Sequence, residues 1–397
     1  MSERRTQMIW FVTVAAAFSV ANLYYAQPLA ETIARDFGSD AAGVSSALVG
    51  TQLGYAAGML LLAPLCDVRE RRATIVATAC GCALALLGFS VAPSVLLLTV
   101  ASIAIGLGAS VTQMLVPFAV GLGTPADRGR IVGTVMGGVL AGILLSRTAS
   151  GALGAAIGWR AVFGAAALVM AGLAMLLRVV LPLSPPTTNL PYRSLLASMW
   201  RILRRERVLR RRAVIGALGF GSFSVFWSTI VFHLARSPIG GGSRLAGMLG
   251  ILGLSGVIVA PIVGRLAMRF APTKINLLAL VLIAGSFAVF YAGAESLVVI
   301  CIGVVVMDAG AQANHLTNQT VIFGLAPEER SRVNAIYMVG YFLGGALGTA
   351  VAAQAWERGG WTWVCITGAA SSLLAVPALR RSTRGDRSPP TAPAARS

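Results

Sequence analysis

The run "LVVICIGVVVMDAGAQANHLTNQTVIF" (residues 297–323) decides the fold class, because it is long and apolar enough to cross a lipid bilayer. Asp308 is its only acid, and His315 is one of 2 histidines in the chain. Asp308 falls near the middle of this run, and therefore near the middle of the expected span. A charge at that depth is costly, so its side chain is expected to face a cavity or a partner and not lipid.

The other polar side chains of this run gather on one side of the expected helix. At about 100° per residue, several fall within roughly 60° of Asp308, and others lie on the flank of that stripe. We predict that Asp308 and His315 carry a proton or cation and that the amides contact a substrate; hydrogen bonding between helices is the alternative. The side chains are Gln312, His315 and Gln319 on the stripe, and Asn314 and Asn318 on its flank.

The composition of the whole chain is that of an integral membrane protein. Of its 397 residues, 56% are hydrophobic and 12% are charged, and the mean hydropathy is +0.79. A soluble domain of this size would be about one quarter charged. The 5 cysteines form no metal-ligand pattern, and no phosphate-binding loop or nucleophile motif occurs. We therefore expect neither an enzyme nor a cofactor or metal site.

Apolar segments of about 20 residues predict an all-α fold of twelve membrane spans. The longest polar connector divides them into two sets, which gives four regions: an N-terminal half (1–182), a central cytoplasmic connector (183–212), a C-terminal half (213–379) and a disordered cytoplasmic tail (380–397). The spans are expected at 8–30, 43–66, 72–92, 94–123, 131–156, 159–182, 213–235, 244–268, 273–293, 296–325, 333–355 and 361–379.

The loop charges predict the orientation of these spans. The net charge is +18, and most of the 32 Lys and Arg residues lie in the loops that share a side with both termini. Because basic loops stay in the cytoplasm, we expect both termini to be cytoplasmic. This placement accounts for the net charge without a nucleic-acid partner. The arginine-rich connector is expected to form a helix in the headgroup layer.

Two short motifs recur in the two halves. "TPADRGR" (124–130) returns as "APEERSR" (326–332), and "GWRAVF" (158–163) returns as "GWTWV" (360–364). Because each half has an even number of spans, both halves have the same orientation in the membrane. Two parallel six-helix repeats place a pathway between the halves, with a binding site near the bilayer midplane.

The loop "APLCDVRERR" (63–72) resembles the G-x-x-x-D-R-x-G-R-R motif of the major facilitator superfamily. Asp67, Arg71 and Arg72 match that motif, whereas Val68 and Glu70 depart from it, as does Ala63. "NLYYAQPLA" (22–30) and "GILLSRTASG" (142–151) are similar to the superfamily's bacterial branch of proton-coupled drug and metabolite exporters. The resemblance implies the fold of that superfamily, alternating access and a monomer. It also identifies Asp67, Arg71 and Arg72 as a cytoplasmic gate motif.

Other residues are candidates for the pathway. Arg147 lies at a depth close to that of Asp308, and we hypothesise that the two face one central cavity and change their pairing during transport. A structural role for Arg147 is the alternative. The remaining candidates for the substrate cavity are Asn22, Tyr25, Gln27, Gln113 and Trp227. Tyr24 lies in the same stretch, and anchoring at the membrane interface is the alternative to a pathway role for it.

Two features bear on the mechanism implied by the resemblance. Proton-coupled exporters of the superfamily carry an arginine in span 4 where this chain has Ser102. The resemblance also pairs span 2 with span 11 and span 5 with span 8, and the glycine-rich faces of spans 2, 5 and 11 are expected to be sliding surfaces between the halves.

The sequence thus predicts a multi-pass transporter of the bacterial inner membrane whose partners are a small molecule, protons and lipid. Proton-coupled efflux of a small organic molecule or drug is the leading function. Uptake by proton symport or facilitated diffusion is one alternative, which Ser102 leaves open. A membrane sensor that transports nothing is another, although the connector and tail carry no signalling motif.

Overall fold

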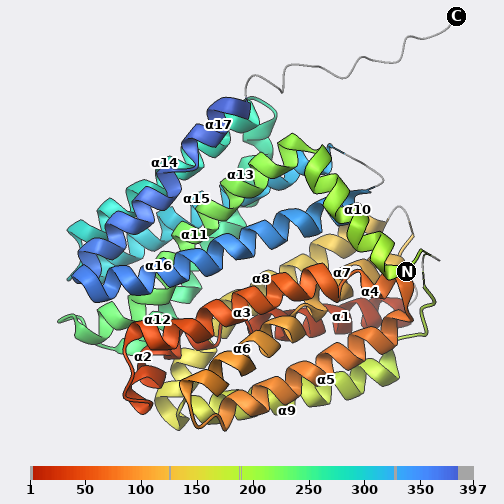
Figure 1. Cartoon of the computed structure of the whole chain (residues 1–397), viewed down its shortest axis with the longest axis horizontal. Coiled ribbons are helices and arrows are strands. Elements are labelled where there is room, and N and C mark those ends of the chain that lie inside the picture. Colours follow the sequence, from red (N-terminus) through yellow and green to blue (C-terminus); the bar gives the residue numbers. More distant parts are fainter. Residues whose placement is uncertain (1–2, 125–126, 187, 189, 326–328, 383–397) are drawn as a thin grey trace, which may run out of the picture.

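The computed structural model describes the chain except for residues 1–2, 125–126, 187, 189, 326–328 and 383–397, and it omits the side chains of residues 254–257, 260 and 380–382. Every regular element among the described residues is a helix. Figure 1 shows two groups of long helices, with the earlier part of the chain in the lower group and the later part in the upper group. The predicted all-α membrane fold is confirmed.

The first group of helices contains α1 to α9, and a connector helix α10 follows it. The bounds are α1 Glu3–Ala21, α2 Ala26–Asp36, α3 Ala41–Leu61, α4 Leu65–Val68, α5 Arg71–Ser90, α6 Val95–Ala109, α7 Val111–Gly121, α8 Arg128–Ile157, α9 Trp159–Val180 and α10 Tyr192–Arg205. We call α1 to α9 the N-terminal half.

The second group, the C-terminal half, contains α11 to α17. Its bounds are α11 Arg207–Arg236, α12 Gly242–Leu249, the 3-10 helix η2 Gly250–Gly253, α13 Leu254–Ala267, α14 Pro272–Ala292, α15 Leu297–Phe323, α16 Arg330–Leu373 and α17 Val376–Ser382. Helix α11 begins inside the predicted connector. Helix α17 includes the first residues of the predicted tail, and the rest of that tail lies outside the described residues.

Within the described residues, 10 helical stretches are long and apolar enough to cross a membrane. One of them, Arg330–Leu379, contains both of the last two predicted spans, which are separated by a kink where the backbone leaves the helical conformation at Gly359 and Gly360. The predicted span 8 is not among the 10, because it is divided into α12, η2 and α13. The predicted spans 1 and 4 are also broken, before α2 and at Ser110.

The repeated Gly-Trp motif places a glycine with positive φ before a buried tryptophan in both halves. Gly158 and Gly360 both have positive φ values, 82° and 59°, which glycine adopts without the penalty that a Cβ would bring. Each is followed by a buried tryptophan whose indole N–H donates a hydrogen bond: Trp159 to Asp36 Oδ2 at 3.2 Å, and Trp361 to the Phe290 carbonyl at 3.0 Å. The recurrence in sequence therefore reflects a recurring corner in the structure.

The two halves meet along two pairs of helices. Helix α3 packs on α16, where Gln52 Nε2 donates to Thr349 Oγ1 at 2.9 Å. Helix α8 packs on α12, where Thr148 Oγ1 donates to the Gly247 carbonyl at 3.0 Å. These are the pairings of spans 2 with 11 and 5 with 8 that the resemblance implied.

The glycine-rich faces do not lie where we expected. A Cβ built on Gly54 would meet Ile103 of α6, one on Gly142 would meet α1, and one on Gly348 would meet α11. All three faces therefore allow close packing within a half, and the expectation of glycine-lined sliding surfaces was wrong for them. The close approach between the halves lies elsewhere: a Cβ on Gly151 would lie 3.0 Å from Gly247 Cα.

Candidate functional site

Arg147 is buried in α8 at the junction of the two halves, with 2% of its surface exposed. Its Nε donates a hydrogen bond of 2.8 Å to Gln27 Oε1. Its guanidinium carbon lies 4.6 Å from the centre of the Tyr24 ring and 4.3 Å from that of Trp227. Aromatic faces stabilise a cation that has lost its water. The sequence flagged Arg147, Gln27 and Trp227 independently, and the structure brings them together.

Asp308 lies on α15 and is also buried, with 7% of its surface exposed. It interacts electrostatically with Arg147 and lies beside Trp227. A Cβ on Gly253 of η2 would lie 3.1 Å from Asp308 Oδ2, and a Cβ on Gly250 would lie 3.0 Å from Arg147 Cβ. The segment η2 therefore packs against the Asp308 carboxylate and the aliphatic part of the Arg147 side chain, and both side chains are buried.

The two charges do not form a salt bridge. No pair of their charged atoms is within bonding distance among the described residues. Arg147 Nη2, Asp308 Oδ1 and Trp227 Nε1 are all buried and have no hydrogen-bond partner in the described part of the chain. Unsatisfied buried polar atoms are costly and uncommon in native proteins. These three atoms are therefore available for hydrogen bonds to a ligand.

Aromatic rings line one side of these charges. Phe223 lies 6.0 Å from Trp227 and 5.7 Å from Phe220, which stacks on Tyr341 at 4.1 Å. Tyr341 also lies in the vicinity of Asp308 and Tyr24. We call Tyr24, Phe220, Phe223, Trp227 and Tyr341 the aromatic wall. Only Trp227 among them was predicted as a pathway residue, because single aromatic residues in apolar helices give no signal of which face they occupy.

The two adjacent tyrosines have different surroundings. Tyr24, for which interfacial anchoring was the alternative to a pathway role, lies under Arg147. Tyr25 instead packs edge-on against Phe163 at 6.4 Å, within the N-terminal half. Asn22 Nδ2 donates to the Phe18 and Ser19 carbonyls of α1 and lies 3.8 Å from Cys82 Sγ, so its amide stabilises the turn before α2.

The asparagines of α15 point into a second polar cluster inside the C-terminal half. Arg212, fully buried in α11, donates from Nη1 to Asn276 Oδ1 at 2.7 Å. Asn276 Nδ2 donates to Asn314 Oδ1 at 2.7 Å, and Asn318 Nδ2 approaches the same oxygen at 3.3 Å. The sequence missed Arg212 and Asn276, because an arginine beside a basic loop resembles a topology signal.

The remaining polar residues of α15 make contacts within the same half. His315 Nδ1 lies 3.2 Å from Tyr337 Oη, and its ring lies 4.7 Å from that of Tyr341. His315 therefore lies between Tyr337 and the Tyr341 ring of the aromatic wall. Gln319 Nε2 approaches Asn334 Oδ1 at 3.4 Å, and Gln312 is partly exposed.

A cavity of about 400 Å³ lies between the halves at the end that carries α10. It is lined by Gln113 of α7, by Asp67 and Arg71, and by Arg332 of α16. Gln113 Nε2 donates to Tyr55 Oη at 2.9 Å, and the Tyr55 ring meets Phe342 across the halves at 4.6 Å. This cavity contains the predicted residues Gln113, Asp67 and Arg71, but neither Arg147 nor Asp308 lines it.

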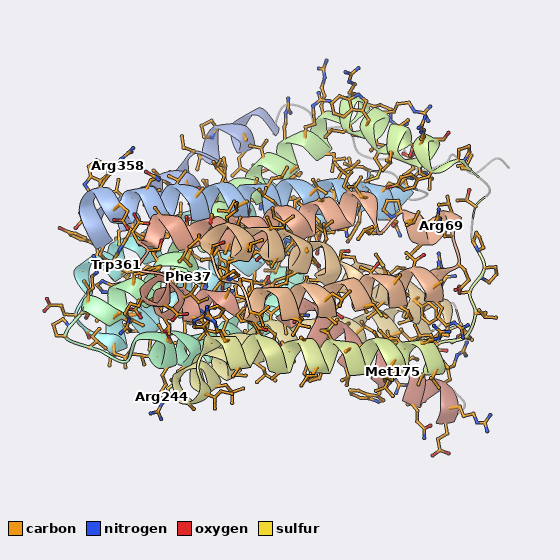
Figure 2. The ribbon with its side chains drawn as sticks, turned by 60° about the horizontal axis from the view of Figure 1, so that its bottom comes forward. Phe37, Arg69, Met175, Arg244, Arg358 and Trp361 are labelled. Atoms are coloured by element: carbon orange, nitrogen blue, oxygen red, sulfur yellow. The ribbon has the colours of Figure 1, made fainter. Side chains whose placement is uncertain are left out.

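The halves also touch at the opposite end of the molecule. Thr32 Oγ1 lies 3.0 Å from Ser243 Oγ, and the Ala41 amide donates to Glu357 Oε1 at 3.2 Å. Figure 2 shows Arg69 near one end of the bundle and Arg244 and Arg358 near the other. Loops that the sequence assigned to opposite sides of the membrane thus lie at opposite ends.

The gate motif contacts the segment that leaves α9. Asp67 forms a salt bridge of 3.3 Å with Arg71, and Arg72 Nη1 donates to the Leu181 carbonyl at 3.2 Å. Glu70, a departure from the family motif, caps α5. Its partial burial would raise the pKa of its carboxyl, but hydrogen bonds from backbone N–H groups, including that of Ser184, outweigh this effect and lower the pKa.

The sequence was compared with models of known protein families to identify the family of this chain. The model described as Major Facilitator Superfamily matches residues 9–304 and 248–396. The chain belongs to the major facilitator superfamily. It is therefore a multi-pass membrane transporter and not an enzyme.

Individual relatives and solved structures are also similar to this chain. The uncharacterized transporter YgaY of Escherichia coli O157:H7 is 38% identical over 367 residues, which are 92% of this chain and 93% of YgaY. Two solved structures share the fold at low identity. The nucleoside transporter NupG has a TM-score of 0.76 at 14% identity and covers 94% of this chain and 99% of its own. A POT family transporter has a TM-score of 0.77 at 13% identity and covers 95% and 96%.

Proposed function

We propose that this superfamily member is a proton-coupled exporter of a small organic molecule in the bacterial inner membrane, with both termini in the cytoplasm. The observation that carries the proposal is a pair of opposite charges, Arg147 and Asp308, buried where the two halves meet and not joined by a salt bridge. A carboxylate in a site of low dielectric constant binds a proton when a nearby cation moves away. Rocking of the halves would move α8 relative to α15 and so change this distance.

In the proposed cycle, Asp308 holds either a proton or the substrate, and the two halves rock around the site. The end of the molecule that carries α10 is partly open, because a cavity lies there between the halves. The opposite end is closed by contacts between the halves. The Asp67–Arg71 pair and the connector helix surround the cavity, which supports their role in its opening and closing.

The first test is a transport assay of the Asp308→Asn variant. Compounds that raise the unfolding temperature of the purified protein are first selected from a metabolite and drug library. Proteoliposomes with an imposed proton gradient then measure the transport of those compounds. We expect Asp308→Asn to abolish the acceleration by the gradient, while Glu295→Gln, on an exposed acid outside the spans, keeps it. Gradient-driven transport at the wild-type rate in Asp308→Asn would refute the proposal.

Proton symport is the second candidate function. It stays open because Ser102 stands where proton-coupled exporters of the superfamily carry an arginine. The Ser102 hydroxyl donates to the Leu98 carbonyl of its own helix at 2.8 Å and is fully buried, so span 4 supplies no charge here. The direction of proton movement separates the candidates. When substrate is added outside proteoliposomes with an acidic interior, antiport releases protons outward, whereas symport carries protons inward with the substrate.

A further inference from the structure

Three buried atoms beside the two charges have unused hydrogen-bonding capacity of complementary kinds. Arg147 Nη2 and Trp227 Nε1 are donors, and Asp308 Oδ1 is an acceptor. Two of these groups carry opposite charges. A ligand that satisfied all three would offer an anionic acceptor on one side and a donor, best a cationic one, on the other.

The positions of the charges limit the size of such a ligand. Gly250 and Gly253 are one turn apart in η2, and a Cβ on each would touch Arg147 and Asp308 respectively. The Asp308 carboxylate and the aliphatic part of the Arg147 side chain therefore lie against the same short segment, and the two side chains interact electrostatically. This arrangement suits a ligand whose opposite charges are separated by a few atoms. The aromatic wall beside them gives an apolar surface for the rest of the molecule.

We propose that the substrate is a compact zwitterion, of the amino-acid class, whose carboxylate binds Arg147 and Trp227 and whose ammonium group binds Asp308. This inference rests on the proposed transport function and assigns its substrate class. A ligand with only one of the charges leaves the other buried charge without a partner, which is unfavourable in a site of low dielectric constant. The ammonium group and a proton would then compete for the same carboxylate. This competition couples proton entry to substrate exit, as export driven by a proton gradient requires.

An anionic substrate bound together with a proton on Asp308 would satisfy the same atoms, so the test must separate these two ligands. Matched trios of compounds do so: an amino acid, its amide, which lacks the carboxylate, and its N-acetyl derivative, which lacks the ammonium group. Trios built on alanine, leucine and phenylalanine vary the apolar part. The readout is the concentration dependence of the unfolding temperature of the purified full-length protein.

In the wild-type protein, we expect at least one amino acid to bind about tenfold more tightly than both of its derivatives, because each derivative loses a charge-assisted bond. Arg147→Gln is expected to remove the discrimination against the amide, and Asp308→Asn the discrimination against the N-acetyl derivative. Trp227→Phe keeps an aromatic ring but removes the N–H donor, so it should weaken the binding of only those compounds that carry a carboxylate. Arg178→Gln, on an exposed arginine of α9, is the matched control and should leave the order unchanged.

Three results would overturn the proposal: no amino acid of any trio stabilises the protein, the N-acetyl derivative binds as tightly as its parent, or the amide does. If Arg147→Gln or Asp308→Asn does not fold, the wild-type order and Trp227→Phe still decide. The outcome is also separate from that for transport. Proton-driven transport of an amide would uphold the proposed function and reject the zwitterion, and zwitterion binding without proton-driven transport would do the reverse.

Discussion

At the scale of the residue, this protein stabilises buried arginines in two different ways. Arg147 has the faces of Tyr24 and Trp227 and one hydrogen bond to Gln27, so much of its bonding capacity stays available. Arg212 instead donates to Asn276 within a network of side-chain amides. The first arrangement suits a ligand site, and the second suits a fixed structural link between α11, α14 and α15.

This difference predicts a stability defect for Arg212→Ala. The substitution leaves Asn276 Oδ1 buried without its donor and opens a void, so we expect the free energy of unfolding to fall by about 2–4 kcal/mol. Thermal unfolding of the purified protein measures the effect, with Arg207→Ala, an exposed arginine of the same helix, as the control. Equal unfolding temperatures for the two variants would show that the amide network does not stabilise the fold.

At the scale of the element, span 8 is divided into α12, η2 and α13, whereas its counterpart in the first repeat, span 2, contains the single long helix α3. A continuous helix would satisfy its backbone within the segment, and breaks at membrane depth are tolerated where the chain is covered by protein. Here the 3-10 segment η2 lies against Arg147 and Asp308, and α12 crosses α8 closely at Gly151 and Gly247. The break therefore brings the backbone of the C-terminal half close to the site.

The position of Gly253 predicts a specific transport defect. In Gly253→Ala, the new methyl group would overlap the Leu144 side chain and approach Asp308 Oδ2 to 3.1 Å. Overpacking of this kind costs about 1–3 kcal/mol. We expect roughly tenfold slower initial transport in proteoliposomes. Gly264→Ala is the control, because a Cβ there meets nothing within 4 Å. An unchanged rate in Gly253→Ala would show that η2 does not need this close approach.

At the scale of the whole molecule, the two halves touch at one end and leave a cavity at the other. The Thr32–Ser243 contact joins α2 to α12 across the halves, whereas the cavity of about 400 Å³ lies between them at the α10 end. The proposed alternating access requires the contact between α2 and α12 to separate in each cycle.

A disulfide across that contact should therefore stop transport. In a variant with Thr32→Cys and Ser243→Cys, the sulfur atoms would replace oxygens that lie 3.0 Å apart. Oxidation is expected to abolish transport, and reduction to restore it. The control pair is Ser46→Cys and Thr99→Cys, whose hydroxyl oxygens lie 2.7 Å apart within the N-terminal half. Oxidised Thr32→Cys/Ser243→Cys protein that still transports would rule out this opening motion.

Several conclusions depended on sequence alone, because they follow from local composition. The length of the apolar runs predicted a membrane protein. The recurring Gly-Trp motif helped to predict the internal repeat, and the structure has a glycine with positive φ at both corners. The presence of Asp308 and Arg147 in apolar spans marked them as candidates, because an ionic side chain is costly in lipid wherever it points.

Only the tertiary structure decided which faces of the helices meet. It placed Tyr24 and not Tyr25 beside Arg147, turned Asn314 and Asn318 toward Arg212, and directed the glycine faces into their own halves. Lipid and protein interior are both apolar, so the periodicity that marks a buried face in a soluble helix is weak in a membrane span. The orientation of each helix is set by contacts with residues far away in the sequence, and these contacts exist only after the helices have packed.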